Sequence, residues 1–212
     1  MHVERLELPD VLVVRPRVIR DERGYFVETF NKRAMPEPIA QADFVQDNQT
    51  LSSRPFTIRG LHFQVGASAQ AKLVRVLSGS VLDVVVDLRR ASPYFGRYAK
   101  TILSAEGFEQ LWVPTGFAHG FCTLETDSTV LYKVTNFFDP EAERGIRWDD
   151  PDLDIQWGVD NNEVTLSARD RQHSLFRDLR SHFRARGFGV HADNCHGGRR
   201  LCRISGMPLS HQ

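Results

Sequence analysis

Residues 59–64 read Arg59-Gly60-Leu61-His62-Phe63-Gln64, and this stretch has the alternating pattern of a β-strand. Because successive side chains of a strand point to opposite faces, His62 is expected on the face opposite Leu61 and Phe63. The same alternation places Arg59 on the face of those two apolar residues. An imidazole on the inner wall of a β fold can act as a base, bind a metal or be a hydrogen-bonded core residue. The stretch alone leaves these three roles open.

Similar strands are expected on both sides of this stretch. Ser78-Gly79-Ser80, between two runs rich in β-branched residues, predicts a β-hairpin. Short strands at roughly ten-residue spacing with turn signals between them indicate an all-β sandwich or barrel. The runs that predict strands are 44–50, 72–77, 81–88, 98–103, 111–113 and 129–136, with two or three shorter ones within 3–30.

The C-terminal part of the chain changes character twice. Four apolar residues between positions 175 and 183 have helical spacing, which predicts an amphipathic helix over 174–186. After Gly187 this periodicity stops, and glycine, arginine and histidine become frequent. We therefore expect one domain over 1–186 and a poorly ordered tail over 187–212.

Composition limits the class of protein. The 212 residues are 41% hydrophobic, enough for one domain with a sizeable core. The net charge is zero, which argues against nucleic-acid binding but allows one anionic ligand held by a few arginines. Neither a secretory h-region nor an apolar run of ~18 residues occurs, so no membrane partner is expected. Cys122, Cys195 and Cys202 indicate free thiols in the cytoplasm, not a disulfide framework.

Polar residues at alternate positions mark a second strand of interest. Gln46, Asn48 and Thr50 fall on one face of the strand expected at 44–50. Amides on one face can read a polar ligand through paired donors and acceptors, or they can be ordinary surface. Arg23 and Glu28, which flank a turn near residue 24, are by default solvated surface charges.

Six residues could together build an acid–base site. A histidine can take a proton from an acidified carbon, and a carboxylate orients its ring. A tyrosine can return a proton, and a lysine can stabilise an enolate oxygen. Taken singly, His62 and Tyr132 are more often satisfied core residues, and their joint occurrence is what favours catalysis. The candidates are His62, His119, Tyr132, Asp170, Lys72 and Arg59.

A metal site is the rival reading of the same residues. Metal-binding cupin barrels often use an H-x-H strand, a downstream glutamate and a histidine from a second motif, which residues 114–119 resemble. However, position 64 holds Gln64, and residues 67–71 contain no glutamate. Lys72 follows closely, and its ammonium repels a metal cation. We therefore expect no catalytic metal.

Six motifs follow one another along the chain: Arg23-Gly24-x-Phe26-x-Glu28, Gln46-Asp47-Asn48, Arg59-Gly60-Leu61-His62-Phe63-Gln64, Val113-Pro114-x-Gly116-Phe117-Ala118-His119-Gly120-Phe121, Tyr132-Lys133-Val134-Thr135 and Leu166-Ser167-x-Arg169-Asp170. Any one is weak, but the ordered set over about residues 3–185 is specific and resembles the dTDP-4-dehydrorhamnose 3,5-epimerase family. The resemblance implies a mainly β, cupin-type (jelly-roll) barrel with a few short helices. It also implies an isomerase that needs no metal or other cofactor, usually a homodimer whose N-terminal strands cross to the partner.

The resemblance also implies roles for individual residues. His62 would be the general base paired with Asp170, Tyr132 the general acid, and Lys72 the group that polarises the C4 carbonyl. Arg59 and His119 would lie at the substrate, with Arg59 toward the diphosphate. The remaining substrate-contact positions are Arg23, Glu28, Gln46, Asn48, Glu143 and Arg169, of which Arg23 and Glu28 would reach into the partner's barrel.

The chain departs from the family pattern at a few positions. Arg169 stands where lysine is usual, and the two cations bind oxygens differently. Phe137 and Phe138 replace tyrosines, which keeps an aromatic face but removes a hydroxyl, and Gly158 replaces a proline. The alternatives to a 3,5-epimerase are a C3- or C5-only monoepimerase, a ketoisomerase of a dTDP-4-keto-6-deoxysugar, and a non-catalytic nucleotide-sugar binding module.

Overall fold

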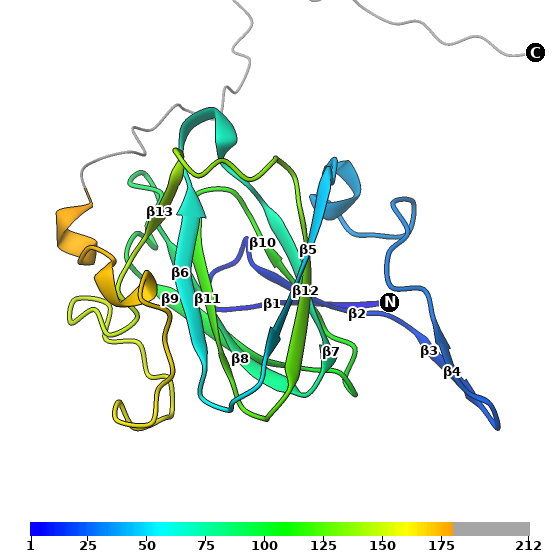
Figure 1. The fold of residues 1–212 in the computed structure, drawn as a ribbon. Coiled ribbons are helices and arrows are strands. Elements are labelled where there is room, and N and C mark those ends of the chain that lie inside the picture. Colours follow the sequence, from blue (N-terminus) through cyan, green and yellow to red (C-terminus); the bar gives the residue numbers. More distant parts are fainter. Residues whose placement is uncertain (180–212) are drawn as a thin grey trace, which may run out of the picture.

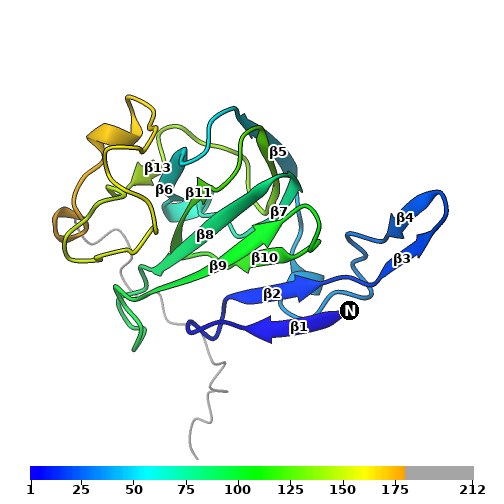
Figure 2. The same cartoon turned by 90° about the horizontal axis from the view of Figure 1, so that it is seen from below.

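The computed structural model describes residues 1–179, which form two facing antiparallel sheets and a projecting hairpin (Figure 1). The first sheet has the strand order β1-β2-β10-β7-β12-β5 and the second β13-β6-β11-β8-β9, while β3 and β4 pair only with each other. Figure 2 shows this hairpin extending away from the sheets. The strands are β1 (His2–Arg5), β2 (Leu12–Arg15), β3 (Val18–Asp21), β4 (Gly24–Val27), β5 (Gln46–Ser52), β6 (Ile58–Gln64), β7 (Lys72–Ser78), β8 (Ser80–Asp87), β9 (Tyr98–Ser104), β10 (Gln110–Val113), β11 (Phe117–Thr123), β12 (Ser128–Val134) and β13 (Glu143–Gly145).

Helical structure within residues 1–179 is limited to single turns. The 3-10 helices are η1 (Ile39–Gln41), η2 (Gly66–Ser68), η3 (Asp170–Gln172) and η4 (Phe176–Asp178). No helix of this part of the chain is long and apolar enough to cross a membrane. The prediction of a mainly β fold with few short helices is confirmed, although the two sheets stay separate and do not close into one barrel.

Apolar side chains fill the sandwich and cover both of its outer faces. The inner cluster includes Val74, Val85 and Phe121, which point between the two sheets. A second cluster packs Leu61, Phe63 and their neighbours on β8 and β11 against the tryptophan-bearing segment that follows β13. A third packs the outer face of β2, β10 and β7 against the segment that leads into β5. Covering both faces explains why several strands are continuously apolar and not alternating.

Two predictions about local structure are wrong. The Ser78-Gly79-Ser80 turn does not close a hairpin, because β7 pairs with β10 and β12 while β8 pairs with β9 and β11. The turn instead carries the chain from one sheet to the other. The helix expected over 174–186 is also wrong where it can be seen, because Leu175 and Leu179 are extended on either side of η4. Its remainder, the tail at 187–212, Cys195 and Cys202 lie outside the described residues.

Candidate active site

Strand β6 presents Arg59 and His62 on the same face because it contains a bulge. His62 pairs with His119 and Arg59 pairs with Phe121, so Gly60 and Leu61 together face one residue of β11. A regular strand would place residues three apart on opposite faces, and the extra residue reverses this. The prediction that Arg59 shares the face of Leu61 is therefore wrong, whereas His62 does lie opposite Leu61 and Phe63.

The bulge requires glycine on both strands. Gly60 has a φ of +129°, and a Cβ built there would lie 2.5 Å from the Cα of Gly120. A Cβ on Gly120 would lie 2.8 Å from the carbonyl oxygen of Arg59. Any side chain at either position would force the two strands apart, and the geometry that turns Arg59 inward would be lost.

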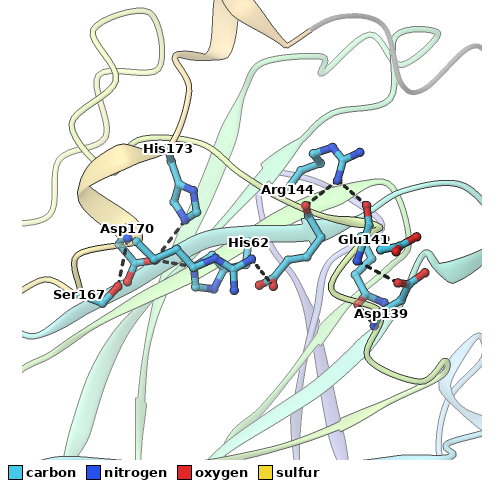
Figure 3. Close-up of polar contacts among 10 residues, drawn as sticks. His62, Asp139, Glu141, Arg144, Ser167, Asp170 and His173 are labelled. Atoms are coloured by element: carbon cyan, nitrogen blue, oxygen red, sulfur yellow. Dashed lines mark hydrogen bonds and ion pairs between the residues drawn. The ribbon is translucent and has the colours of Figure 1, made fainter.

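His62 shares a carboxylate with a second histidine. Its Nε2 lies 2.6 Å from Oδ1 of Asp170, and Nε2 of His173 lies 3.1 Å from the same oxygen. Figure 3 shows both rings directed at Asp170, and the hydroxyl oxygen of Ser167 accepts the Asp170 backbone N–H at 3.0 Å. Burial raises the pKa of Asp170, but hydrogen bonds from His173 and His62 outweigh it and hold this pKa well below its usual range. Asp170 is therefore an ionised acceptor for both rings.

Hydrogen bonding explains this cluster without a metal. The ligand atoms of His62, Asp170 and His173 lie within 4.8 Å of one another, a spacing that could hold a cation. The two hydrogen bonds to one oxygen already produce that spacing. The side chain of Gln64 donates to two backbone carbonyl oxygens and accepts a backbone N–H, so it joins loops together and offers nothing to an ion.

A second histidine–aspartate pair lies deeper between the sheets. Nε2 of His119 lies 2.9 and 3.0 Å from the two carboxylate oxygens of Asp83 on β8. Burial lowers the pKa of His119, and the attraction of Asp83 offsets this only in part. At neutral pH His119 is thus an uncharged ring fixed in one orientation by its partner.

Lys72 and Tyr132 approach the same interior from the opposite sheet. The Lys72 ammonium lies 6.0 Å from the centroid of the Tyr132 ring. Burial lowers the pKa of Lys72 to about 8, with Asp83 and Glu143 acting in the opposite direction. Burial and the charge of Glu143 raise the pKa of Tyr132, while Arg59 lowers it. The charges that act on these two groups lie on the second sheet, so Lys72 and Tyr132, on adjacent strands of the first sheet, both point toward the second.

Strand β5 adds polar groups at one border of this interior. Gln46 and Asn48 share its less exposed face, as predicted, and Gln46 donates from Nε2 to Oδ1 of Asn48 at 2.8 Å. Asn48 pairs with Tyr132 across the strands. Arg59 is anchored here, since its guanidinium donates to Ser52 Oγ and to the Leu51 carbonyl, both at 3.0 Å.

Glu143 and Arg169 border the site on the other side. They form an ion pair between β13 and the residue before η3. A pocket of about 390 Å³ lies between β13 and the C-terminal segment, and Glu143, Arg169 and His173 are among its lining residues. Glu143 therefore lines this outer pocket while its charge also acts on Lys72 and Tyr132.

Arg23 and Glu28 are not brought to the site within this chain. Arg23 lies in the β3–β4 hairpin, its side chain is 84% exposed, and it pairs with Asp21 at 2.6 Å. Glu28 follows β4 and accepts a hydrogen bond from Asn31 at 3.0 Å.

Two residues of the site, Asp83 and His173, were not among the sequence predictions. Asp83 had a signal, because a carboxylate inside the apolar run 81–88 must find a partner when buried. His173 had a weaker signal, because it follows Asp170 by three residues, a spacing that brings two side chains together only in a helical turn, and no such turn was predicted there.

The arrangement is suited to proton transfer at carbon. Asp170 occupies Nε2 of His62, which leaves Nδ1 of the ring to accept a proton. Tyr132, with a raised pKa, is protonated at neutral pH and projects from the opposite sheet. Lys72, whose ammonium lies 6.0 Å from the Tyr132 ring centroid, supplies a positive charge for a developing oxyanion.

Comparisons with known proteins agree with this geometry. The family model described as dTDP-4-dehydrorhamnose 3,5-epimerase matches residues 5–178. The dTDP-4-dehydrorhamnose 3,5-epimerase of Shigella flexneri is 47% identical over 179 residues, covering 84% of this chain and 97% of that protein. The crystal structure of dTDP-6-deoxy-D-glucose-3,5-epimerase from Legionella pneumophila in complex with dTDP-4-keto-L-rhamnose has a TM-score of 0.81 and 37% identity, covering 86% and 96%. A 3'-monoepimerase from Streptomyces bikiniensis in complex with dTDP-quinovose has a TM-score of 0.74 and 31% identity, covering 82% and 87%.

Proposed function

Because the chain belongs to the dTDP-4-dehydrorhamnose 3,5-epimerase family, we propose that it converts dTDP-4-dehydro-6-deoxy-D-glucose to dTDP-4-dehydro-L-rhamnose by inverting C3 and C5. It is an isomerase with the cupin-type fold of that family, and the product serves dTDP-L-rhamnose biosynthesis. The observation that carries the proposal is the His62–Asp170 hydrogen bond of 2.6 Å on a strand that faces Tyr132.

His62 is the general base in this mechanism. The 4-keto group of the sugar acidifies the hydrogens at C3 and C5, and the free nitrogen of His62 removes each in turn. Asp170 holds the ring and stabilises the imidazolium that forms, because an ionised carboxylate accepts its second N–H.

Lys72 and Tyr132 act on the other parts of the transition state. As the proton leaves carbon, negative charge moves to the C4 oxygen, where the Lys72 ammonium stabilises it. Tyr132 delivers a proton to the opposite face of the sugar, which inverts the centre. The substrate is not oxidised in the net reaction, so the proposal needs no redox cofactor.

Polar groups around the interior hold the nucleotide sugar. Arg59 suits the diphosphate, because the planar guanidinium matches phosphate oxygens. His119 lies at the sugar, where its neutral ring can hydrogen-bond a hydroxyl or the carbonyl. The remaining substrate contacts are assigned to Gln46, Asn48, Glu143 and Arg169.

We further propose a homodimer in which N-terminal strands cross to the partner. The β3–β4 hairpin leaves Ile19, Tyr25 and Phe26 52%, 59% and 68% exposed, a run of apolar surface that is unusual on a monomer. Crossing would cover these residues and would bring Arg23 and Glu28 to the partner's site.

We also propose a domain organisation and a location for the protein. We assign catalysis to residues 1–186, since the family model ends at 178, and give no catalytic role to 187–212. We place the protein in the cytoplasm, where a buried free thiol such as Cys122 remains reduced.

Incubation with dTDP-4-dehydro-6-deoxy-D-glucose in heavy water tests the proposal. Deuterium should enter at C3 and C5, and NMR of the product should show inversion at both carbons. Inversion at one carbon would identify a monoepimerase, a candidate favoured by the similarity to the Streptomyces bikiniensis protein. Movement of the carbonyl would identify a ketoisomerase, and binding without exchange a non-catalytic module.

A further inference from the structure

His173 lies outside the motifs that carry the family assignment, yet it contacts the carboxylate that orients the proposed base. Its Nε2 is 3.1 Å from Oδ1 of Asp170, the same oxygen that His62 approaches to 2.6 Å. The two rings also touch edge to face, with centroids 5.2 Å apart and planes at 81° (Figure 3). The His173 side chain is only 9% exposed, so it belongs to the interior of the site and not to its surface.

A glycine on the neighbouring strand makes room for this ring. Gly145 of β13 pairs with His62 of β6. A Cβ on Gly145 would lie 2.3 Å from Cε1 and Nδ1 of His173. The imidazole therefore fills the space of a missing side chain next to the base. It is held on one side by Gly145 and on another by Asp170.

We propose that His173 is a positioning residue for the reaction: it shares the Asp170 carboxylate with His62 and thereby sets the orientation and the basicity of the base. This inference rests on the proposed function of His62. His173 itself contacts neither the substrate nor the reacting carbon in the proposal, and it acts only through Asp170.

The direction of the effect follows from the shared acceptor. A carboxylate stabilises a neighbouring imidazolium, and a second donor on the same oxygen takes up part of its negative charge. With His173 in place, His62 is therefore a weaker base that passes its proton to solvent more readily once Tyr132 has protonated the carbon. Without the His173 N–H, Asp170 would interact more strongly with protonated His62, and the base would titrate at higher pH.

The other titratable and charged groups around the site are all retained when His173 alone is replaced. His119 faces it from β11 and interacts with it electrostatically. The further groups are Asp83 on β8, Lys72 on β7, and the ion-paired Glu143 and Arg169 on β13 and before η3. A shift in the midpoint of the pH profile on replacing His173 can therefore be assigned to the shared Asp170 carboxylate.

Two variants distinguish the hydrogen bond that His173 donates from the packing of its ring. His173→Phe keeps an aromatic ring over Gly145 but removes the N–H, whereas His173→Gln keeps an N–H that can reach Asp170. The pH dependence of kcat/KM for deuterium incorporation is measured for both and for the parent protein. In His173→Phe the midpoint of the base limb should move up by about half to one pH unit, so exchange at low pH falls about three- to tenfold. In His173→Gln the midpoint should stay near that of the parent.

An unchanged midpoint in His173→Phe would overturn the proposal, as would a uniform loss of rate in both variants with a lowered melting temperature. Gly145→Ala, which displaces the ring without altering its chemistry, should reproduce the upward shift and replaces His173→Phe if that variant does not fold.

NMR titration of the His62 ring separates this proposal from the function on which it rests. The signal is assigned by its absence from His62→Ala, and no substrate is present. A higher midpoint in His173→Phe than in the parent supports the role of His173, and equal midpoints refute it. Absence of exchange in the parent protein would instead refute the epimerase function and leave the titration to decide His173.

Discussion

At the residue scale, His62 should be the least replaceable side chain. His62→Ala removes the base, and deuterium incorporation at C3 and C5 should fall by about 10²–10⁴-fold, the usual contribution of general-base catalysis. His2→Ala is the matched control, because His2 is exposed on β1, away from the sandwich interior, and should leave exchange unchanged. Full exchange in His62→Ala would refute the assignment of the base.

The lowered pKa of Lys72 predicts an upper pH limit for the reaction. Burial places its pKa at about 8, so the ammonium that stabilises the enolate is lost as pH rises through that value. We expect kcat/KM to decline above about pH 8. In Lys72→Arg, whose charge persists to much higher pH, the surviving activity should lack this decline. A parent profile that stays flat to pH 10 would contradict the role of Lys72.

The same burial predicts that Lys72 destabilises the protein. Its folded pKa of about 8 is below the ordinary 10.5, so between these values the unfolded chain holds a proton that the folded chain has released. Stability due to this group therefore rises with pH through that window, and below it the buried ammonium is unfavourable. At pH 7, Lys72→Met should have a free energy of unfolding higher by on the order of 1–3 kcal/mol, measured by denaturant unfolding. Its deuterium exchange should be largely lost. Equal stability of the two proteins would show that the ammonium is well solvated.

The sequence identifies the titrating residues better than it identifies their partners. His62, Tyr132 and Asp170 can be named because they lie in recognisable motifs, and Lys72 by its position in the same resemblance. The pairs His119–Asp83 and His62–Asp170 depend on which distant segments become neighbours, and no local pattern contains that information.

At the scale of the element, β6 shows where alternation fails. The pattern of 59–64 predicts the strand and the face of His62. However, one extra residue opposite Gly120 turns the Arg59 side chain to the same face as His62. The signal available in sequence is the pair of glycines at 60 and 120, since isolated glycines in strands often mark bulges or close backbone approach. The hairpin predicted at residues 78–80 is wrong for a related reason. Turn residues show where the chain bends, not which strand it pairs with next.

Gly60→Ala should disturb the bulge and the site together. The new Cβ would lie 2.5 Å from the backbone of Gly120, so we expect a stability loss of about 2–4 kcal/mol in denaturant unfolding, with reduced exchange from displaced Arg59 and His62. Gly24→Ala is the control for backbone strain, because Gly24 has a nearly equal φ of +125° but nothing within 4 Å of its Cβ position. If both variants lose the same stability, the clash with Gly120 is not the cause.

At the scale of the whole molecule, strand spacing and turn signals were enough to predict a mainly β fold. They could not show that the sheets remain separate, because closure depends on strand tilt and pairing at the edges. The helix predicted from the apolar spacing near residue 175 is wrong for a physical reason. Phe176 and Leu179 pack against the second apolar cluster from a single 3-10 turn flanked by extended residues, and packing overrides local periodicity.

The proposed dimer can be tested with one residue type in two places. Ile19 on the hairpin and Ile102 on β9 are 52% and 58% exposed. If the hairpin is buried by a partner, Ile19→Asp should shift the mass measured by light scattering after gel filtration from dimer to monomer and should lower exchange. Ile102→Asp should do neither. A parent protein that runs as a monomer at all concentrations would refute the dimer.

Placing Arg23 on a projecting hairpin has a consequence for genetics. If each hairpin completes the partner's site, a chain lacking His62 and a chain lacking Arg23 carry defects that complement each other. In the mixed dimer, one site combines both lesions while the other is intact. Two impaired proteins, unfolded and refolded together, would then regain about a quarter of the normal activity, given random pairing in a two-fold assembly. Alleles that are harmful alone would thus be tolerated when co-expressed.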